Sequence, residues 1–326
     1  ENNFEGEFMS KEILSKKINE FQEGDLIEGF YLLKSLQVKE NKNGKKYLDL
    51  DLVDKTGEIN GKYWNVQPEE LDIFYPGSIL KIRGEITSFD NKLQLKVTKI
   101  RNIQESDEIE VSDFVPKAPE EGSSMYQIIL GYIENMEDED IKNICRDIYQ
   151  EKEQKLSFYP AAQKNHHSIY GGLLYHITTM LKTAEALAGI YTFINTDILY
   201  AGVLLHDISK TDEMDSNELG IVSEYTFEGQ MLGHIIQGIK LVNEKGKKFN
   251  VPTEKVVILE HMILSHHNEP EYGSPKRPMI PEAELLCHID MMDARMYDMS
   301  KALEGLEKGS FTEKIWLLNN RKLYKY

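Results

Sequence analysis

The sequence predicts a two-domain α+β protein, in which a small β-barrel precedes an all-helical domain. Short alternating runs of apolar and polar residues, typical of strands, occupy residues 25–103. A charged segment that contains Pro116 and Pro119 follows them. From residue 125 onward the apolar residues recur with helical spacing, and no convincing strand pattern interrupts them.

Five strands account for the first third of the chain. Strand patterns cover residues 25–40, 45–54, 57–66 and 78–100, and the last range holds two strands joined around Asp90-Asn91. Asn43-Gly44 is a hairpin signal. Residues 68–75 predict a short helical piece between the third and fourth strands. This order matches the oligonucleotide-binding (OB) barrel better than a sandwich.

The predicted domain boundaries follow from these patterns. Residues 1–18 are an N-terminal lead or a cloning remnant, residues 19–105 form the OB domain, residues 106–124 are a linker, and residues 125–326 form the helical domain.

Aromatic and basic side chains on the predicted strands suit single-stranded nucleic acid. Bases stack on aromatic rings while lysines follow the backbone. The candidates are Tyr47, Tyr63, Trp64 and Phe89, with Lys45, Lys46, Lys62 and Lys92 nearby. The alternative is that these rings pack the barrel. Because Tyr63 and Trp64 are consecutive, at least one of them points outward.

Charge is unevenly distributed along the chain. The net charge is −17, with 13 basic and 15 acidic residues in 19–105 but 22 and 36 in 106–326. A strongly acidic domain repels polyanions unless metals or a basic patch lie where the substrate binds. The two cysteines are far apart, and no membrane span or signal peptide is evident, so we expect a cytoplasmic protein without membrane contact.

Three of the predicted helices direct ionisable groups toward the core. The helical apolar stripes place His176 and Asp290 on inward faces, and His206-Asp207 ends a helix that is apolar nearly all round. A single inward histidine is more often a satisfied core residue. Several such groups in one core, however, need a shared cation or one another. Imidazole and carboxylate together suit manganese, iron or zinc, and the lack of cysteine ligands argues against structural zinc.

Further histidines extend this set. His234 lies on an amphipathic helix, and His266 and His267 end another. His261 is off the face of that pair and is interpreted as structural. Along the chain these candidate ligands occur in the order His, His-Asp, His, His-His, Asp. This ordered series is a much more specific pattern than any one of its parts.

These residues resemble the HD-domain superfamily of metal-dependent phosphohydrolases. An OB domain followed by "NHHSIYGGLLYHI", "DILYAGVLLHDISK", "YTFEGQMLGHI", "SHHNEPEYGSPKRP" and "HIDMMDARM" is similar to the family of YhaM-type 3′-to-5′ exoribonucleases. The resemblance covers the chain from about Asp25 to its end.

The resemblance implies a divalent metal centre with one or two ions, manganese being expected and Fe²⁺, Co²⁺ and Mg²⁺ being alternatives. The first-metal ligands match His176, His206, Asp207 and Asp290, and the additional ligands match His234, His266 and His267, with Asp207 bridging. Lys210 matches a lysine that meets a phosphate. Ser209 stands where relatives commonly have glycine, and serine makes a positive φ less favourable, which bears on the placement of Lys210.

The implied function is 3′-to-5′ exoribonuclease activity. Metal-activated water would hydrolyse terminal phosphodiesters of single-stranded RNA, with single-stranded DNA as a second candidate substrate, and release nucleoside 5′-monophosphates. Asp207 and Lys210 would be catalytic, and cationic substrate contacts would come from Lys276, Arg277 and Arg295.

Several roles stay open at this stage. His166 and His167 are assigned to substrate binding or proton transfer, against exposed loop histidines. Asp293 either supports Asp290 or forms a surface salt bridge. Rival functions are an HD nucleotidase whose OB domain contacts proteins, and a binding module with a degenerate site. The oligomeric state is also open, a ring that encloses the substrate included.

Overall fold

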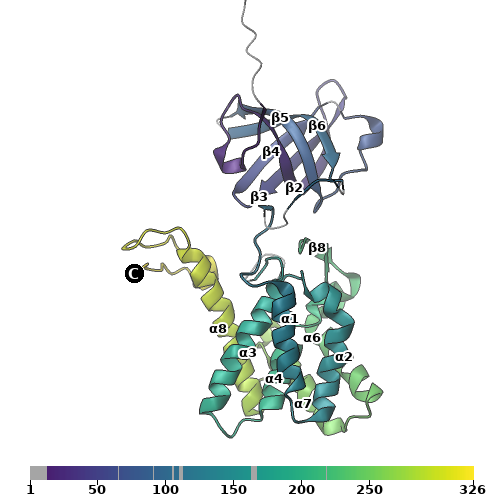
Figure 1. The fold of residues 1–326 in the computed structure, drawn as a ribbon, viewed down its shortest axis with the longest axis vertical. Coiled ribbons are helices and arrows are strands. Elements are labelled where there is room, and N and C mark those ends of the chain that lie inside the picture. Colours follow the sequence, from purple (N-terminus) through teal and green to yellow (C-terminus); the bar gives the residue numbers. More distant parts are fainter. Residues whose placement is uncertain are drawn as a thin grey trace, which may run out of the picture. The chain divides into compact units, whose positions relative to one another are not determined.

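The computed structural model describes residues 13–64, 66–90, 92–104, 106–109, 113–162, 167–217 and 219–326. The chain divides into two compact units, residues 1–116 and 117–326 (Figure 1). The division falls within the segment that the sequence predicts to be a linker.

The first unit is a closed five-stranded barrel. Its strands are β2 (Leu26–Glu40), β3 (Lys46–Asp54), β4 (Gly57–Tyr63), β5 (Ile79–Phe89) and β6 (Lys92–Asn102). The strand order is β2-β3-β4-β6-β5, and β5 pairs back onto β2 to close the barrel. Strands β4 and β6 are parallel, and the other barrel pairs are antiparallel. The predicted OB barrel is confirmed.

Short elements complete this unit. Strand β1 (Ile13–Leu14) pairs with the start of β2, and a 3₁₀ turn, η1 (Ile18–Glu20), precedes β2. A second 3₁₀ turn, η2 (Pro68–Glu70), lies between β4 and β5, where the sequence predicts a short helical piece.

Alternation along the strands fills the barrel interior. Leu48, Leu50 and Leu52 of β3 are fully buried, while the carboxylates of Asp49 and Asp51 between them accept hydrogen bonds from the Asn60 side chain. A bulge interrupts the β5–β6 register next to Gly84. A Cβ at Gly84 would lie 2.5 Å from the carbonyl oxygen of Lys96, so only glycine allows this close approach of the two strands.

The second unit is a helical bundle. Its helices are α1 (Gly122–Glu134), α2 (Glu139–Leu156), α3 (Gly172–Ile190), α4 (Thr196–Leu205), α5 (Lys210–Glu213), α6 (Phe227–Lys248), α7 (Thr253–Ser265) and α8 (Pro281–Leu303), with 3₁₀ turns η4 (Pro270–Tyr272) and η5 (Trp316–Leu318). None of the helices in the described ranges is long and apolar enough to span a membrane.

Helix α4 lies at the centre of the bundle, where it packs against α2, α3, α7 and α8. Gly202 permits this packing, because a Cβ there would lie 2.2 Å from Cε of Met262 and 3.2 Å from Leu286. Asn195 begins the helix by accepting a hydrogen bond from the backbone N–H of Ile198. The polar residues that follow α4 are thereby held within the bundle.

One feature of the second unit differs from the prediction of helices alone. Strands β7 (Met214–Ser216) and β8 (Val222–Tyr225) form a small antiparallel hairpin between α5 and α6. Strands of three and four residues are too short to show a period of two in the sequence.

Candidate metal centre

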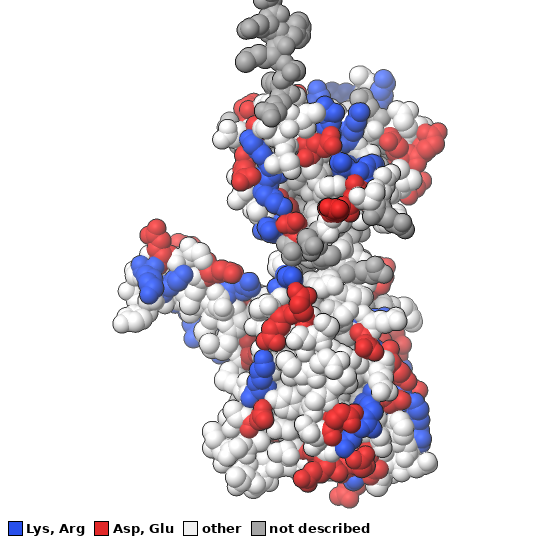
Figure 2. Space-filling view, in the orientation of Figure 1, with Lys and Arg blue, Asp and Glu red and all other residues white. Residues whose placement is uncertain are grey.

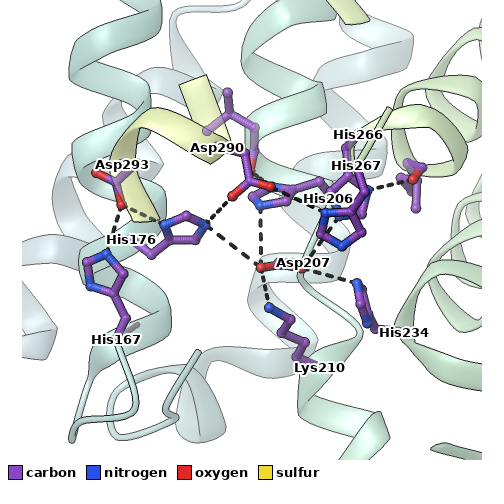
Figure 3. A network of polar contacts seen from close by, with 12 residues as sticks. His167, His176, His206, Asp207, Lys210, His234, His266, His267, Asp290 and Asp293 are labelled. Atoms are coloured by element: carbon purple, nitrogen blue, oxygen red, sulfur yellow. Dashed lines mark hydrogen bonds and ion pairs between the residues drawn. The ribbon is translucent and has the colours of Figure 1, made fainter. Parts of the chain in front are cut away.

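Five helices bring the predicted ligands together in the second unit (Figure 3). Helix α3 carries one histidine, α4 ends at the His-Asp pair, α6 carries one histidine, α7 ends at the His-His pair, and α8 carries an aspartate. The gathered residues are His176, His206, Asp207, His234, His266, His267 and Asp290. His206 and His266 are fully buried, whereas the side chain of His267 is 26% exposed, so the cluster opens to solvent on that side.

Asp207 lies between two groups of histidines. Its Oδ2 atom is 3.4 Å from Nε2 of His206 and 3.8 Å from Nε2 of His176. Its Oδ1 atom is 3.4 Å from Nε2 of His234 and 3.9 Å from Nε2 of His266. A carboxylate in this position can bind a cation with each oxygen.

Asp290 spans the same two groups from α8. Its Oδ1 atom is 3.3 Å from Nε2 of His176, and its Oδ2 atom is 3.7 Å from Nδ1 of His267. Two aspartates from different helices therefore face the same set of imidazoles.

Backbone carbonyls fix the rings of His206 and His266. Nδ1 of His206 donates to the carbonyl oxygen of Val203 over 2.9 Å, and Nδ1 of His266 donates to that of Ile263 over 2.7 Å. A carbonyl oxygen only accepts, so Nδ1 carries the proton and Nε2 keeps its lone pair.

Carboxylates fix the rings of His176 and His234 in the same way, through a hydrogen bond from Nδ1. Nδ1 of His176 donates to Oδ2 of Asp293 over 2.7 Å, and Nδ1 of His234 donates to Oε1 of Glu213 over 3.2 Å. Such partners hold a ligand imidazole in one tautomer and one orientation.

The buried polar atoms of the cluster fit a cation. Nε2 of His206, His234 and His266 and Oδ1 of Asp207 are buried and have no hydrogen-bond partner among the residues that the structure describes. Each buried polar atom left unsatisfied costs about 1–3 kcal/mol. Nitrogen lone pairs that converge on carboxylate oxygens are the donors that divalent transition metals bind.

Protonation within the cluster follows from burial and neighbouring charges. Burial lowers the pKa of His266 and His267, so both rings are neutral near pH 7. Burial also acts to lower the pKa of His176, but its hydrogen bonds to Asp290 and Asp293 outweigh this and raise it to about 10. A cation that binds His176 must displace this proton.

Lys210 contacts the aspartate of the His-Asp pair. Its Nζ atom donates to Oδ2 of Asp207 over 2.7 Å. Burial opposes ionisation of Asp207, but Lys210 and His206 hold the pKa of this carboxyl well below its usual range. The expected conflict at Ser209 does not occur, because Ser209 has φ −78° and the turn needs no positive φ.

His167 is buried, and it is therefore not the exposed loop histidine of the alternative assignment. It is 1% exposed, its ring packs 4.0 Å from that of Tyr297, and its Nε2 donates to Oδ2 of Asp293 over 2.8 Å. Asp293 thus joins two buried histidines, His167 and His176, and forms no surface salt bridge with any residue that the structure describes. His166, the other candidate, lies outside the described residues.

Two residues of the cluster are absent from the sequence-based predictions. Glu213 supports His234, and Tyr297 packs on His167. Tyr297 follows Asp293 by four residues, so a shared helix face is the signal that could identify it. No sequence pattern indicates Glu213.

The predicted cationic contacts remain at the surface. Lys276, Arg277 and Arg295 are exposed, and Arg277 pairs with Glu269 at 3.2 Å. Since each residue turns about 100° around a helix, Arg295 faces away from Asp293. None of the three contacts the histidine cluster within the described part of the chain. His261, interpreted as structural, accepts the backbone N–H of Met279.

The aromatic candidates of the barrel separate into two groups. Trp64, 42% exposed, stacks on Tyr47 with ring centroids 4.3 Å apart, and Lys62 lies over the Tyr47 ring. Phe89 is exposed and lines a cavity of about 720 Å³. Tyr63, by contrast, points into the barrel, where its hydroxyl donates to Glu70, so it does not join the outer surface. Figure 2 shows basic and acidic side chains interspersed over the barrel unit.

Comparisons with known proteins agree with this geometry. The family model described as the HD domain matches residues 173–295, and the model described as an OB-fold nucleic acid binding domain matches residues 33–103. Fold and site thus define an HD-domain hydrolase that depends on a divalent metal and carries an OB domain.

Curated relatives identify the family to which the chain belongs within this class of hydrolases. A protein of Geobacillus sp. strain WCH70 named 3′-5′ exoribonuclease YhaM is 41% identical over 96% of this chain and 95% of its own length. The protein of the same name from Halalkalibacterium halodurans is 39% identical over 96% of this chain and 97% of its own length. The chain belongs to the YhaM family.

Among solved structures, the second OB-fold domain of replication protein A from Methanococcus maripaludis is 27% identical. The match covers 28% of this chain and 98% of that one, with a TM-score of 0.22.

Proposed function

We propose that this protein shortens single-stranded RNA from its 3′ end, hydrolysing the terminal phosphodiester and releasing nucleoside 5′-monophosphates. The observation that carries the proposal is the position of Asp207, whose two oxygens face separate groups of histidines. The names of the two relatives support the direction of cleavage and the choice of RNA.

The residues that would hold the metal form two overlapping sets. His176, His206, Asp207 and Asp290 would hold one ion, and His234, His266, His267 and Asp207 would hold a second. The donors are imidazole nitrogen and carboxylate oxygen without sulfur, so we propose Mn²⁺, with Fe²⁺, Co²⁺ and Mg²⁺ as ions for comparison. When bound, such ions polarise the phosphodiester and lower the pKa of water.

Lys210 supplies a fixed positive charge beside this set. Its ammonium group is held against Asp207, within reach of a non-bridging oxygen of a bound phosphodiester. Hydrolysis breaks the bond between phosphorus and the 3′ oxygen of the penultimate nucleotide. The released nucleotide keeps the phosphate, and the shortened strand ends in a 3′ hydroxyl.

The outer surface of the barrel would hold the upstream strand. The exposed face of Trp64, backed by Tyr47, is a platform on which a base can stack, and Lys62 adds a cation next to it. Stacking does not require a 2′ hydroxyl, so we propose single-stranded DNA as a second substrate.

Product analysis tests this function. RNA labelled at its 5′ end, the DNA of the same sequence, and free nucleotides are incubated with each ion, and with EDTA as the control. We expect a ladder that shortens one nucleotide at a time, with 5′-monophosphates as products and no reaction in EDTA. Hydrolysis of free nucleotides without shortening of either strand would instead support the nucleotidase function, with the OB domain as a protein-contact module.

A further inference from the structure

Helix α6 is interrupted immediately before His234. Gly233 has φ 70° and ψ 165°, which is outside the helical region, and the residues on both sides continue as helix. The backbone N–H groups after such a break lose their intrahelical acceptors. The N–H of His234 donates instead to Oε1 of Glu213 over 3.0 Å. Glu213 therefore caps the second segment of α6.

The same carboxylate oxygen holds the imidazole of His234. Oε1 of Glu213 accepts from Nδ1 over 3.2 Å, while Nε2 lies 3.4 Å from Oδ1 of Asp207. One side chain thus fixes both the backbone position and the ring orientation of His234. The ring is left with Nε2 directed at Asp207 (Figure 3).

Close backbone packing positions Glu213 for these contacts. The N–H of Thr226 donates to the carbonyl oxygen of Glu213 over 2.9 Å. A Cβ at Gly229 would lie only 2.0 Å from that oxygen, so glycine lets the start of α6 approach the end of α5. The Glu213 side chain is 13% exposed, and although burial opposes its ionisation, His234 holds its pKa below the usual range.

We infer that Glu213 is a positioning residue that fixes His234 as a metal ligand on the Oδ1 side of Asp207. This inference rests on the metal centre of the proposed function. A matching arrangement holds His176 on the Oδ2 side, where Asp293 is the supporting carboxylate. Loss of such a supporting group typically weakens metal binding about 10- to 100-fold.

The test compares Mn²⁺ binding in the full-length wild type and in variants, with bound metal measured by mass spectrometry after equilibrium dialysis over a range of free Mn²⁺. Glu213→Ala removes both hydrogen bonds, and Glu213→Gln keeps an acceptor without its charge. His234→Ala is the benchmark for loss of the ligand. Glu228→Gln is the matched control, because Glu228 is an exposed glutamate on α6 paired with Lys240.

We expect Glu213→Ala to weaken Mn²⁺ binding about 10- to 100-fold and to lose the same fraction of bound metal as His234→Ala. The Mn²⁺ affinity of Glu213→Gln should lie between those of Glu213→Ala and wild type, and that of Glu228→Gln should equal the wild-type affinity. If Glu213→Ala does not fold, the Mn²⁺ affinity of Glu213→Gln alone tests the inference.

A lower Tm in the Glu213 variants with unchanged Mn²⁺ affinity would mean that Glu213 only caps the helix, and would overturn the inference. Unchanged affinity in His234→Ala would overturn it as well. The second result would also remove His234 from the proposed ligand set, but neither result contradicts the proposed hydrolysis of RNA as long as the wild type binds Mn²⁺. A wild type that binds no Mn²⁺, Fe²⁺, Co²⁺ or Mg²⁺ would instead contradict the proposed function itself.

Discussion

Lys210 and Asp207 form a 2.7 Å ion pair three residues apart, on the turn that ends α4 and begins α5. Both side chains are largely buried. The pair places one permanent cation at the centre of the histidine cluster, in a unit whose net charge is strongly negative. Under the proposed function, Lys210 and bound metal would supply the attraction of this unit for a polyanion.

Lys210→Ala should slow cleavage strongly without abolishing RNA binding. The variant removes a preorganised charge from the place proposed for the scissile phosphate, and loss of one such group typically costs about 10²- to 10³-fold in rate. Single-turnover cleavage of end-labelled RNA at saturating enzyme measures the effect. Lys240→Ala, which removes an exposed lysine on α6, is the control and should cleave like wild type.

Asp293→Asn should weaken metal binding through His176. The amide keeps an acceptor but removes the negative charge that is hydrogen-bonded to both His167 and His176, so we expect about 10-fold weaker binding. Calorimetric titration with Mn²⁺ measures this. Glu284→Gln, an exposed change on the same helix, should bind as wild type does, and equal affinities for all three proteins would exclude a role for Asp293.

Trp64→Ala should weaken binding of long single strands. Stacking of a base on an aromatic ring contributes about 1–3 kcal/mol, which corresponds to about 5- to 150-fold in Kd. Fluorescence anisotropy with a labelled RNA in EDTA measures binding without cleavage. Trp316→Ala removes a more exposed tryptophan ring from the second unit and should leave Kd unchanged. If Trp64→Ala and Trp316→Ala bind the labelled RNA with the same Kd, the outer surface of the barrel does not hold the strand.

Asp49 should make the barrel sensitive to acid. Burial acts to raise its pKa, but hydrogen bonds from Lys39, Lys62 and Asn60 outweigh burial and lower the pKa to about 2. Because the folded pKa lies below the unfolded value, this stabilisation is present above about pH 4 and is lost as the pH falls toward 2. The shift corresponds to about 2 kcal/mol.

Urea unfolding of the Trp316→Phe protein and its Asp49→Asn variant, followed by Trp64 fluorescence, measures this contribution. We expect the difference in unfolding free energy between the two proteins to shrink by about 2 kcal/mol from pH 5 to pH 2. A difference that does not change with pH would show that the Asp49 charge does not stabilise the barrel.

Helical period indicated that His176, His206-Asp207 and Asp290 face the core, whereas the full set of seven residues followed from the resemblance to the HD-domain superfamily. Inward-facing positions on an amphipathic helix must pack against other inward-facing positions, so His176, His206 and Asp290 converge once the helices form a bundle. The barrel was predictable for a similar reason, because five alternating runs with a short helix after the third fit few other architectures.

Features that depend on exact backbone geometry were not predictable. Which of Tyr63 and Trp64 faces outward depends on the pleat register that the bulged barrel imposes. The role of Glu213 depends on the break at Gly233, and the burial of His167 depends on a left-handed backbone conformation at φ 54°. None of these has a periodic signature in the sequence.

Cleavage by Asp207→Ala tests the central claim most directly, because each oxygen of Asp207 faces a different group of histidines. The variant and the wild type are each incubated with 5′-labelled single-stranded RNA and Mn²⁺, and RNA binding is measured in parallel. We expect no shortening by the variant while its affinity for RNA stays close to that of wild type. Stepwise 3′ shortening by Asp207→Ala at the wild-type rate would contradict the account.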